Sequence, residues 1–280
     1  MGLGGYLTWT AAIREISNNK IGKDSKIVPC EVIGRTVTKI VESPVFRNNP
    51  YVYDEQRDQG KGVFMLPLNL HETNYCKRDT PSKAYHRNDK HIIEQLCEFY
   101  GINNPLLKCE LYFSKEEKEK ANAICSSLSK EYITIEPHSK TNYTVNRKYP
   151  LKKWQRIVDK LSKDIQVVQV GRKDLPLMNN VVDCRGKTTF REAALIIDKS
   201  KLFLSTEGGL VHAATAVDTR SLVVITGYQS TKMIAYPQNI NLNISSHGPC
   251  GLKIVCEDCQ RDTLNHNEQE IIDKAEQILL

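Results

Sequence analysis

A carboxylate, two glycines and a histidine follow a short apolar run in the second half of the chain. The run 201–205 predicts a buried strand, the tripeptide Glu207–Gly209 breaks it, and an alanine-rich helix carrying His212 follows. A second apolar run, 221–226, predicts the next parallel strand. In such a unit the helix amides and the glycine backbone can approach an anion, while the carboxylate accepts hydrogen bonds from sugar hydroxyls. A plain βαβ connection whose glycines only relieve crowding explains the same pattern, so both interpretations stand.

A polar and basic loop follows another predicted strand. The apolar run 132–136 stops at Pro137, and the segment 138–148 contains lysines, hydroxyl residues and an arginine. Pro150 stands where the first turn of a helix tolerates proline, and apolar residues recur at helical spacing over 154–161. The pattern predicts a strand, a basic loop and an amphipathic helix. The loop either binds an anion or is a solvated surface segment.

Four potential metal ligands lie near the C-terminus. They follow the spacing H-x2-C-x5-C-x2-C and are His247, Cys250, Cys256 and Cys259. Such a set can bind a tetrahedral zinc ion, although the loop between the ligands is short. Five other cysteines stand among apolar residues, which predicts small buried side chains; they are Cys30, Cys97, Cys109, Cys125 and Cys184. We see no secretory leader in the sequence and therefore expect free thiols in a reducing compartment. Zinc is therefore an option and not a requirement.

The elements that must position these residues alternate between helices and strands in two halves. In the N-terminal half we expect helices at 7–17, 91–100 and 115–128, with strands at 26–33 and 62–66. The C-terminal half begins at Tyr132 and alternates strand and helix up to a final helix at 263–280. We therefore predict an α/β protein with domains at 1–128 and 129–262 and a C-terminal helix at 263–280. Two doubly wound, Rossmann-like halves facing a cleft constitute the GT-B architecture, in which ligands bind at the carboxyl ends of the strands.

Motifs in the same order along the chain resemble those of glycosyltransferase family 9, the heptosyltransferase-like enzymes. The resemblance rests on Gly2–Arg14, Asn49–Val52, His91–Leu96, the basic pair before Tyr149-Pro150, Val167–Gly171, Val182–Thr189 and Glu207–His212. It implies an inverting GT-B enzyme that moves a sugar, a heptose by analogy, from a nucleotide-sugar to a saccharide or glycolipid acceptor at the cell surface. Lipopolysaccharide and other surface polysaccharides are products of this class. The resemblance implies no required cofactor beyond the donor substrate.

The resemblance also assigns roles to residues of this chain. Arg147 or Lys148 would hold the donor diphosphate, Glu207 would bind the donor sugar, and the family's glycine turn would face the acceptor. The donor-binding set is Ser139, Lys140, Thr141, Arg147, Lys148, Lys187, Thr188, Glu207, Gly208, Gly209 and His212, and the acceptor-side set is Gly4, Gly5 and Tyr6. Two of these have plain alternatives, because Lys187 could be a solvated lysine and His212 a packed core residue. No cation that would pair with Glu207 is evident from the sequence.

The chain departs from the family at the general base. The family's candidate base is an aspartate in the first glycine turn, and Gly5 stands there, which cannot accept a proton. A base from another loop, such as Glu55 or Asp58, an acceptor that needs little base assistance, or loss of activity would each explain the change. A catalytically silent sugar-nucleotide-binding protein, acting as a partner subunit, is therefore the alternative function.

Charge and hydropathy narrow the range of partners. The formal net charge of +6 and the pI near 8.7 suit an anionic nucleotide-sugar or an acceptor at a membrane surface. No basic patch interleaved with aromatic residues supports nucleic-acid binding. No apolar run approaches the roughly 18 residues of a transmembrane helix. We expect a cytoplasmic protein, with peripheral association at the inner face of the membrane. A Rossmann-like domain would also begin with a strand ahead of Gly2, so either that strand is lost or the true start lies upstream.

Overall fold

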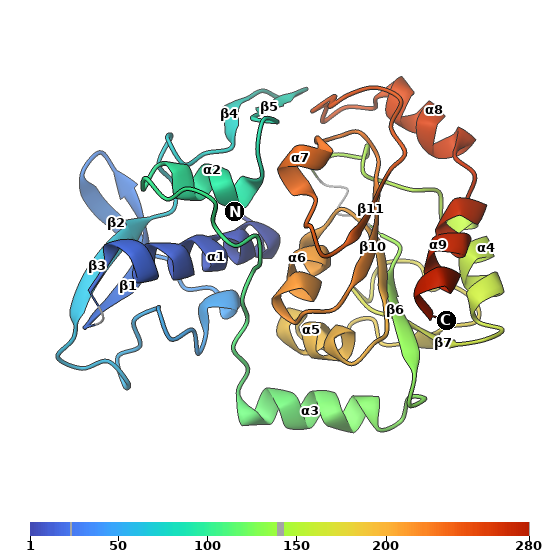
Figure 1. Ribbon diagram of the computed structural model, residues 1–280, viewed down its shortest axis with the longest axis horizontal. Coiled ribbons are helices and arrows are strands. Elements are labelled where there is room, and N and C mark those ends of the chain that lie inside the picture. The colour runs from blue at the N-terminus through green and yellow to red at the C-terminus, as the bar shows by residue number, and fades with distance from the viewer. Residues whose placement is uncertain (23, 139–142, 280) are drawn as a thin grey trace.

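The computed structural model describes residues 1–22, 24–138 and 143–279 and shows two α/β halves side by side (Figure 1). Helix α3 (Lys115–Cys125) lies beneath both halves and precedes the first strand of the C-terminal half. Ser114 caps this helix and Glu117 completes a reciprocal capping box, which explains why it begins at Lys115. The predicted GT-B architecture is confirmed.

The C-terminal half contains a six-stranded sheet in the order β11-β10-β9-β6-β7-β8, with parallel pairing between neighbours. The strands are β6 (Tyr132–Glu136), β7 (Gln166–Gln169), β8 (Val182–Asp183), β9 (Phe203–Thr206), β10 (Ser221–Ile225) and β11 (Ile240–Asn243). The first strand, β6, lies between β7 and β9, so the strand order reverses there. Ligands of open α/β sheets bind in the crevice at such a reversal.

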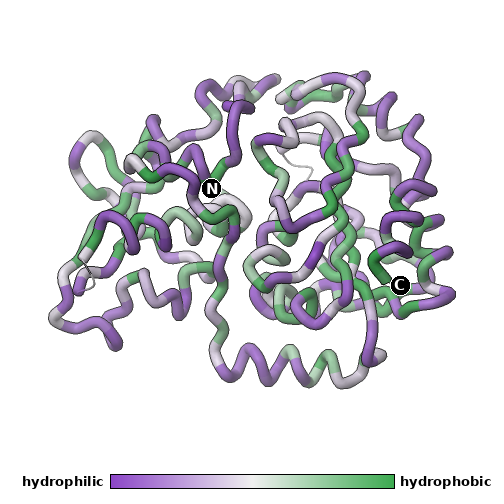
Figure 2. The backbone as a smooth tube through the Cα atoms, viewed as in Figure 1, coloured by the Kyte–Doolittle hydropathy of each residue, from purple (hydrophilic) through white to green (hydrophobic). Residues whose placement is uncertain are grey.

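Helices cover both faces of this sheet. They are α4 (Leu151–Leu161), α5 (Phe190–Asp198), α6 (Gly209–Ala216), α7 (Thr231–Ile234), α8 (Glu257–Asn265) and α9 (Gln269–Leu279). Ile133 and Ile135 of β6 pack in one hydrophobic core with Trp154 of α4, and Tyr132 belongs to the core on the opposite face. The strands are correspondingly apolar in Figure 2, as expected for a parallel sheet buried on both sides.

The N-terminal half has a smaller sheet than a full Rossmann domain. Its order is β2-β1-β3, with β1–β3 parallel and β1–β2 antiparallel. Its elements are α1 (Leu3–Lys20), β1 (Ser25–Ile33), β2 (Thr36–Ile40), the 3-10 turn η1 (Pro44–Phe46), β3 (Gly62–Pro67), the hairpin β4 (Cys76–Asp79) and β5 (Ala84–His86), and α2 (Ile92–Glu98). The expected strands at 26–33 and 62–66 are β1 and β3, whereas β2, β4 and β5 were not predicted.

Helix α1 joins the two halves. It packs against α2 of its own half and against α6 of the other, and it shares one hydrophobic core with both. A Cβ atom on Gly4 would lie 3.1 Å from the Gly209 Cα and 3.1 Å from the His212 Cδ2. A side chain at Gly4 would therefore crowd the start of α6, and the glycine permits the close approach of the two helix N-termini.

The first and the last of the predicted helices differ most from the observed ones. The helix expected from residue 7 begins at Leu3, so Gly4 and Gly5 form its first turn. The single final helix predicted at 263–280 is wrong, because α8 ends at Asn265 and α9 begins at Gln269. At this break Lys153 donates to the backbone carbonyl of Leu264, 2.6 Å away, and the Asn267 side chain accepts from the Gln269 amide. These bonds satisfy backbone groups at the end of one helix and the start of the next.

The buried Arg191 side chain connects α5 to α3 and to the N-terminal half. Its guanidinium pairs with Glu117 at 2.6 Å and donates to the carbonyls of Pro44 at 3.0 Å and Tyr112 at 2.5 Å. Only 2% of the side chain is exposed. One cation thus satisfies groups on three separate segments.

We expect Arg191→Met to destabilise the protein by about 3–5 kcal/mol, because it leaves a carboxylate and two carbonyls without their partner. The matched control is Arg156→Met, whose ion pair with Glu268 is half exposed and should contribute about 0–1 kcal/mol. Urea unfolding of both variants measures the difference. Equal losses of unfolding free energy in the two variants would show that the contacts of Arg191 stabilise the protein no more than an exposed ion pair does.

Candidate functional site

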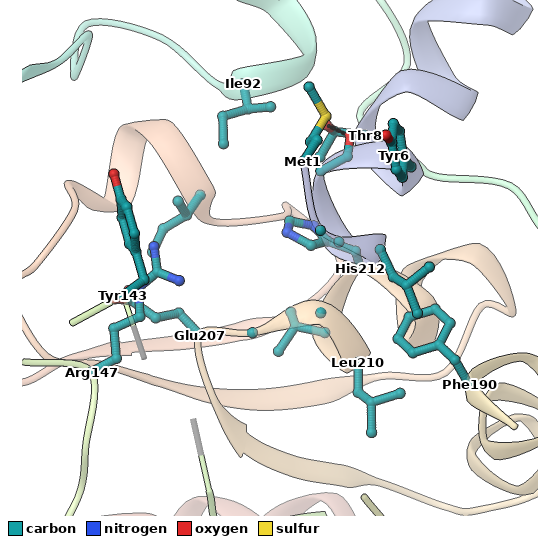
Figure 3. A pocket seen from close by; sticks show the side chains of 18 of the residues that line it. Met1, Tyr6, Thr8, Ile92, Tyr143, Arg147, Phe190, Glu207, Leu210 and His212 are labelled. Carbon is teal, nitrogen blue, oxygen red and sulfur yellow. Dashed lines mark hydrogen bonds and ion pairs between the residues drawn. The ribbon is translucent and has the colours of Figure 1, made fainter. Parts of the chain in front are cut away.

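A cavity of about 1730 Å³ lies between the two halves. The N-terminal turn of α1 and the hairpin β4–β5 contribute residues from one side, and the ends of β6 and β9 with the start of α6 contribute from the other. Figure 3 shows Arg147 and Glu207 on one side of it and His212 below the first turn of α1. The cavity therefore occupies the strand-order reversal between β6 and β9.

Glu207 and Arg147 form an ion pair in the wall of this cavity. Glu207 follows β9, and its carboxylate Oε1 lies 3.2 Å from the Arg147 Nε. The guanidinium also donates to the Gln229 Oε1 at 2.5 Å and stacks 4.7 Å above the centre of the Tyr228 ring. The expectation that Glu207 lacks an ionic partner is thus wrong, because the fold brings Arg147 to it from a distant loop.

The Glu207 carboxylate retains free hydrogen-bonding capacity. The residue is only 5% exposed, yet neither carboxylate oxygen has a hydrogen-bond partner within the described part of the chain. Burial raises the pKa of Glu207 to about 7, and the charge of Arg147 opposes that rise. Buried polar atoms are nearly always hydrogen-bonded in folded proteins, so a carboxylate beside a cavity whose oxygens accept no hydrogen bond from the described residues indicates a place for ligand hydroxyls.

Sequence reasoning missed a second carboxylate, the half-buried Glu136. Glu136 is the last residue of β6, which lies beside β9. A Cβ atom added at Gly171 would lie 3.3 Å from the Glu136 Oε1, and one added at Gly208 would lie 3.8 Å from the Glu136 Oε2. Burial raises the pKa of Glu136 to about 8. A charged residue at the end of an apolar run was the available signal, since that end of the first strand faces the ligand crevice.

The N-terminus of α6 opens into the cavity at Gly208 and Gly209. Gly208 has an extended backbone that any residue can adopt, and added Cβ atoms at both positions would meet only ordinary contacts of 3.6 Å or more. Relief of crowding therefore does not require these two glycines. Their missing side chains leave the α6 amides accessible, as an anion site at a helix N-terminus requires.

His212 both packs in the protein and faces the cavity. Its Nδ1 lies 2.6 Å from the Tyr236 hydroxyl, and the two rings make an edge contact. Burial, helped by the charges of His91 and Arg147, lowers the pKa of His212 to about 3. The ring is therefore neutral and can offer a hydrogen bond but no charge to a bound donor.

The structure brings together most of the predicted residues that it describes. Those that line the cavity are Gly4, Gly5, Tyr6, Arg147, Thr188, Glu207, Gly208, Gly209 and His212. Lys148 and Lys187 are exposed and do not line it. Ser139, Lys140 and Thr141 lie outside the described residues.

Neither of the loop residues considered as a substitute base reaches the cavity. Glu55 is exposed, and Asp58 is buried in ion pairs with Arg57 at 2.9 Å and Lys61 at 2.8 Å. At Gly5 the nearest atoms to an added Cβ belong to the side chains of Met1 and Tyr75, so no backbone blocks the position. Among the described residues, the carboxylates that line the cavity are Glu31, Asp79, Glu136, Asp174 and Glu207.

The four potential metal ligands lie in one cluster after β11. The ligand atoms of His247, Cys256 and Cys259 are all within 4.8 Å of one another, and the Cys250 Sγ is 3.5 Å from the Cys259 Sγ. The second ring nitrogen of His247 lies 2.9 Å from a carboxylate oxygen of Asp262. A carboxylate behind a histidine fixes the orientation of the ring in many metal sites, so the donor set and its support both fit a metal ion.

The helices differ from membrane-spanning segments in length or composition. Within residues 1–22, 24–138 and 143–279, none combines the length and apolar character needed to cross a bilayer.

The half-buried carboxyl of Glu136 makes the stability of the protein depend on pH. Its pKa is higher in the fold than in the unfolded chain, so its contribution is complete below about pH 4.5 and is lost as pH rises through about 8. We expect Glu136→Gln to flatten this part of the profile and to be more stable than wild type at pH 8.5. Urea unfolding between pH 5 and 8.5 measures the free energy of unfolding of wild type and variant. The control is Glu116→Gln, because Glu116 is exposed. A variant slope equal to the wild-type slope would contradict the prediction.

Comparisons with known proteins agree with this geometry. Residues 82–261 match the model of glycosyltransferase family 9 (heptosyltransferase). A family 9 glycosyltransferase from Veillonella parvula has a TM-score of 0.69 at 13% identity, covering 100% of this chain and 94% of that one. The iron-containing dodecameric glycosyltransferase TibC from enterotoxigenic E. coli has a TM-score of 0.66 at 13% identity, covering 100% and 75%.

A third solved structure is similar over a smaller part of the chain. E. coli ADP-heptose lps heptosyltransferase II has a TM-score of 0.52 at 16% identity, with coverage of 68% of this chain and 62% of that one. No curated protein sequence matches the chain. The family match covers β5 of the hairpin, the strand-order reversal and the metal-ligand cluster, so it confirms the resemblance found in the sequence. The chain therefore belongs to glycosyltransferase family 9, the heptosyltransferase family.

Proposed function

We propose that the protein transfers a sugar, with inversion, from a nucleotide-sugar bound at the β6–β9 crevice to a saccharide or glycolipid acceptor. The observation that carries this proposal is the buried carboxylate of Glu207, which lacks hydrogen-bond partners among the described residues and stands beside the open N-terminus of α6. The carboxylate can accept hydrogen bonds from sugar hydroxyls, and the amides at the N-terminus of α6 can bind phosphates. The two requirements of a nucleotide-sugar thus meet at adjacent residues.

The donor diphosphate would lie between the α6 amides and the Arg147 guanidinium. Both supply positive potential to the negative charge that develops on the leaving nucleoside diphosphate, so departure needs no metal at this site. Thr188 lines the same cavity and would contact the nucleoside. The neutral His212 would contribute a hydrogen bond near the start of α1.

The sugar is a heptose in this proposal, and ADP-heptose is the first donor to test. The support is the family's description and the solved complex of TibC with ADP-D-β-D-heptose, which has a TM-score of 0.65 to this chain at 12% identity. The acceptor would enter along Gly4, Gly5 and Tyr6. We assign residues 1–128 to the acceptor side, 129–262 to the donor side and 263–280 to a C-terminal extension. The basic charge supports action at the cytoplasmic face of a membrane.

The proton of the acceptor hydroxyl has to leave without a carboxylate at position 5. Glu136 and Glu31 are two of the carboxylates that line the cavity, and each could accept the proton instead. A carboxylate whose pKa is raised toward the working pH is a better proton acceptor once it is ionised. The rise in the pKa of Glu136 therefore favours it over an ordinary carboxylate.

We also propose that His247, Cys250, Cys256 and Cys259 hold one metal ion. One histidine with three cysteines suits tetrahedral zinc or iron, and TibC is described as iron-containing. Four protein ligands leave no open coordination position, so the ion would support the fold and not the chemistry. Metal analysis of protein purified without added metal, under reducing conditions, tests this assignment.

Turnover separates the enzyme from a silent binding subunit. We expect the purified protein to release nucleoside diphosphate from at least one member of a radiolabelled nucleotide-sugar panel that includes ADP-heptose. The control is the Glu207→Gln variant, which should bind the nucleoside diphosphate and turn over much more slowly. Binding of a nucleotide-sugar without transfer or hydrolysis would instead support the silent subunit.

Arg147 and Lys148 should contribute unequally to diphosphate binding, because only Arg147 lines the cavity. We expect Arg147→Ala to weaken nucleoside-diphosphate binding by about tenfold to a hundredfold, the loss of one charged hydrogen-bonding partner, with less effect at high salt. Lys148→Ala is the matched control and should bind nearly as wild type. Calorimetry with the diphosphate and with the bare nucleoside, which lacks the charge, measures both. Equal diphosphate affinity in wild type and Arg147→Ala would move the phosphate site to the α6 amides alone.

A further inference from the structure

The segment between Cys250 and Cys256 crosses from the C-terminal half to the β4–β5 hairpin of the N-terminal half. Leu252 pairs with Lys83 as an isolated antiparallel bridge. The Ala84 amide donates to the Gly251 carbonyl at 2.9 Å, and the Lys253 amide donates to the Ser82 carbonyl at 2.8 Å. Figure 1 shows the hairpin meeting the loop before α8. A short two-stranded contact thus connects the halves at one end of the cavity.

Close backbone approach and charge reinforce this contact. Gly251 has a φ of +62°, and a Cβ atom there would lie 2.3 Å from the Ala84 carbonyl oxygen. Glycine is therefore required on both grounds. Lys253 pairs with Asp79 of β4, and its ammonium group lies 5.0 Å from the centre of the Tyr143 ring.

The same loop is held firmly by its own half. The Asn146 side-chain amide donates to the carbonyl of Leu252 at 2.7 Å and of Ile254 at 2.8 Å, and its oxygen accepts from the Cys256 amide at 2.9 Å. The Thr144 hydroxyl also donates to the Leu252 carbonyl. Asn146 immediately precedes Arg147, so the loop is coupled to the segment that carries the proposed phosphate ligand.

The metal-ligand cluster closes the base of this loop. Cys250 and Cys256 are its two ends, and His247 and Cys259 lie just outside it. An ion bound to all four fixes both ends and removes conformational freedom from the five residues between them. The loop residues that pair with the hairpin through their backbone, Gly251, Leu252 and Lys253, are among these five.

We propose that the loop Cys250–Cys256 is an interdomain clasp, and that metal occupancy of its four-ligand base controls how tightly the hairpin is held over the cavity. The inference rests on the metal site proposed above and adds a conformational role to it. With the ion bound, the clasp holds Asp79 and His86 of the hairpin in the cavity wall, on the side of Tyr143 and Arg147. Without the ion, the loop gains freedom and its contacts with the hairpin weaken.

Hydrogen exchange of the full chain, read by mass spectrometry, tests the clasp. The amides of Ala84 and Lys253 each bridge the halves, so they should exchange about tenfold faster or more in chelated protein than in metal-loaded protein. Amides of β3 (62–67) are the internal reference and should not change. The Cys259→Ala variant should resemble the chelated protein, whereas Cys125→Ser, which alters a cysteine far from the cluster, should behave as wild type.

A second variant breaks the clasp without altering a metal ligand. Gly251→Val places a side chain against the Ala84 carbonyl, so it should keep the wild-type metal content, exchange faster at Ala84 and bind nucleoside diphosphate severalfold more weakly. Circular dichroism confirms that each variant is folded. Unchanged exchange at Ala84 after verified metal removal, or in folded Gly251→Val, would overturn the clasp. If the protein binds neither zinc nor iron, the proposal that a metal ion controls the clasp is wrong. The transfer assay tests the glycosyltransferase activity separately.

Discussion

The contact between the first turns of α1 and α6 is the constraint on which the rest of the structure depends. Gly4 lets the two helix N-termini approach until only backbone and the His212 ring separate them. The hydrophobic core formed around α1 contains residues of both halves, so the two sheets are positioned by one shared helix. That packing determines the shape of the cavity, because the N-termini of α1 and α6 form adjoining parts of its wall.

The electrostatics of the cavity follow from the same arrangement. Amide dipoles at the start of α6 and the guanidinium of Arg147 make one side attractive to anions, while Glu136 and Glu207 lie at the ends of adjacent strands. Glu207 is buried and Glu136 is half-buried, and loss of contact with solvent raises both pKa values. A pocket with cationic and carboxyl groups side by side distinguishes a sugar linked to phosphate from a simple phosphate, because only the former can satisfy both sets of groups.

The sequence predicted those parts of the site that are local in the chain. The glycine turn before α6, the strand that ends at Pro137 and the helix that begins at Leu151 were all recognisable, because apolar runs and turn residues report local structure. The pairing of Glu207 with Arg147 was not, since it requires β6 and β9 to be neighbours in the sheet. Lys148 illustrates the same limit, because nothing in its local sequence shows that it points away from the cavity while Arg147 points into it.

Several attachments join the halves. They include the α1–α6 contact, the buried Arg191 with its partners on α3 and in the N-terminal half, the loop that meets the β4–β5 hairpin, and the hydrogen bonds that Ser230 donates to Asn88. Two bodies fixed at three points that are not in line cannot rotate relative to one another. Release of the loop from the hairpin would leave the other attachments in place, so the two sheets would keep their relative position. Only the tip of the hairpin would gain freedom, and that end of the cavity would widen for a large substrate without any repacking of the hydrophobic cores.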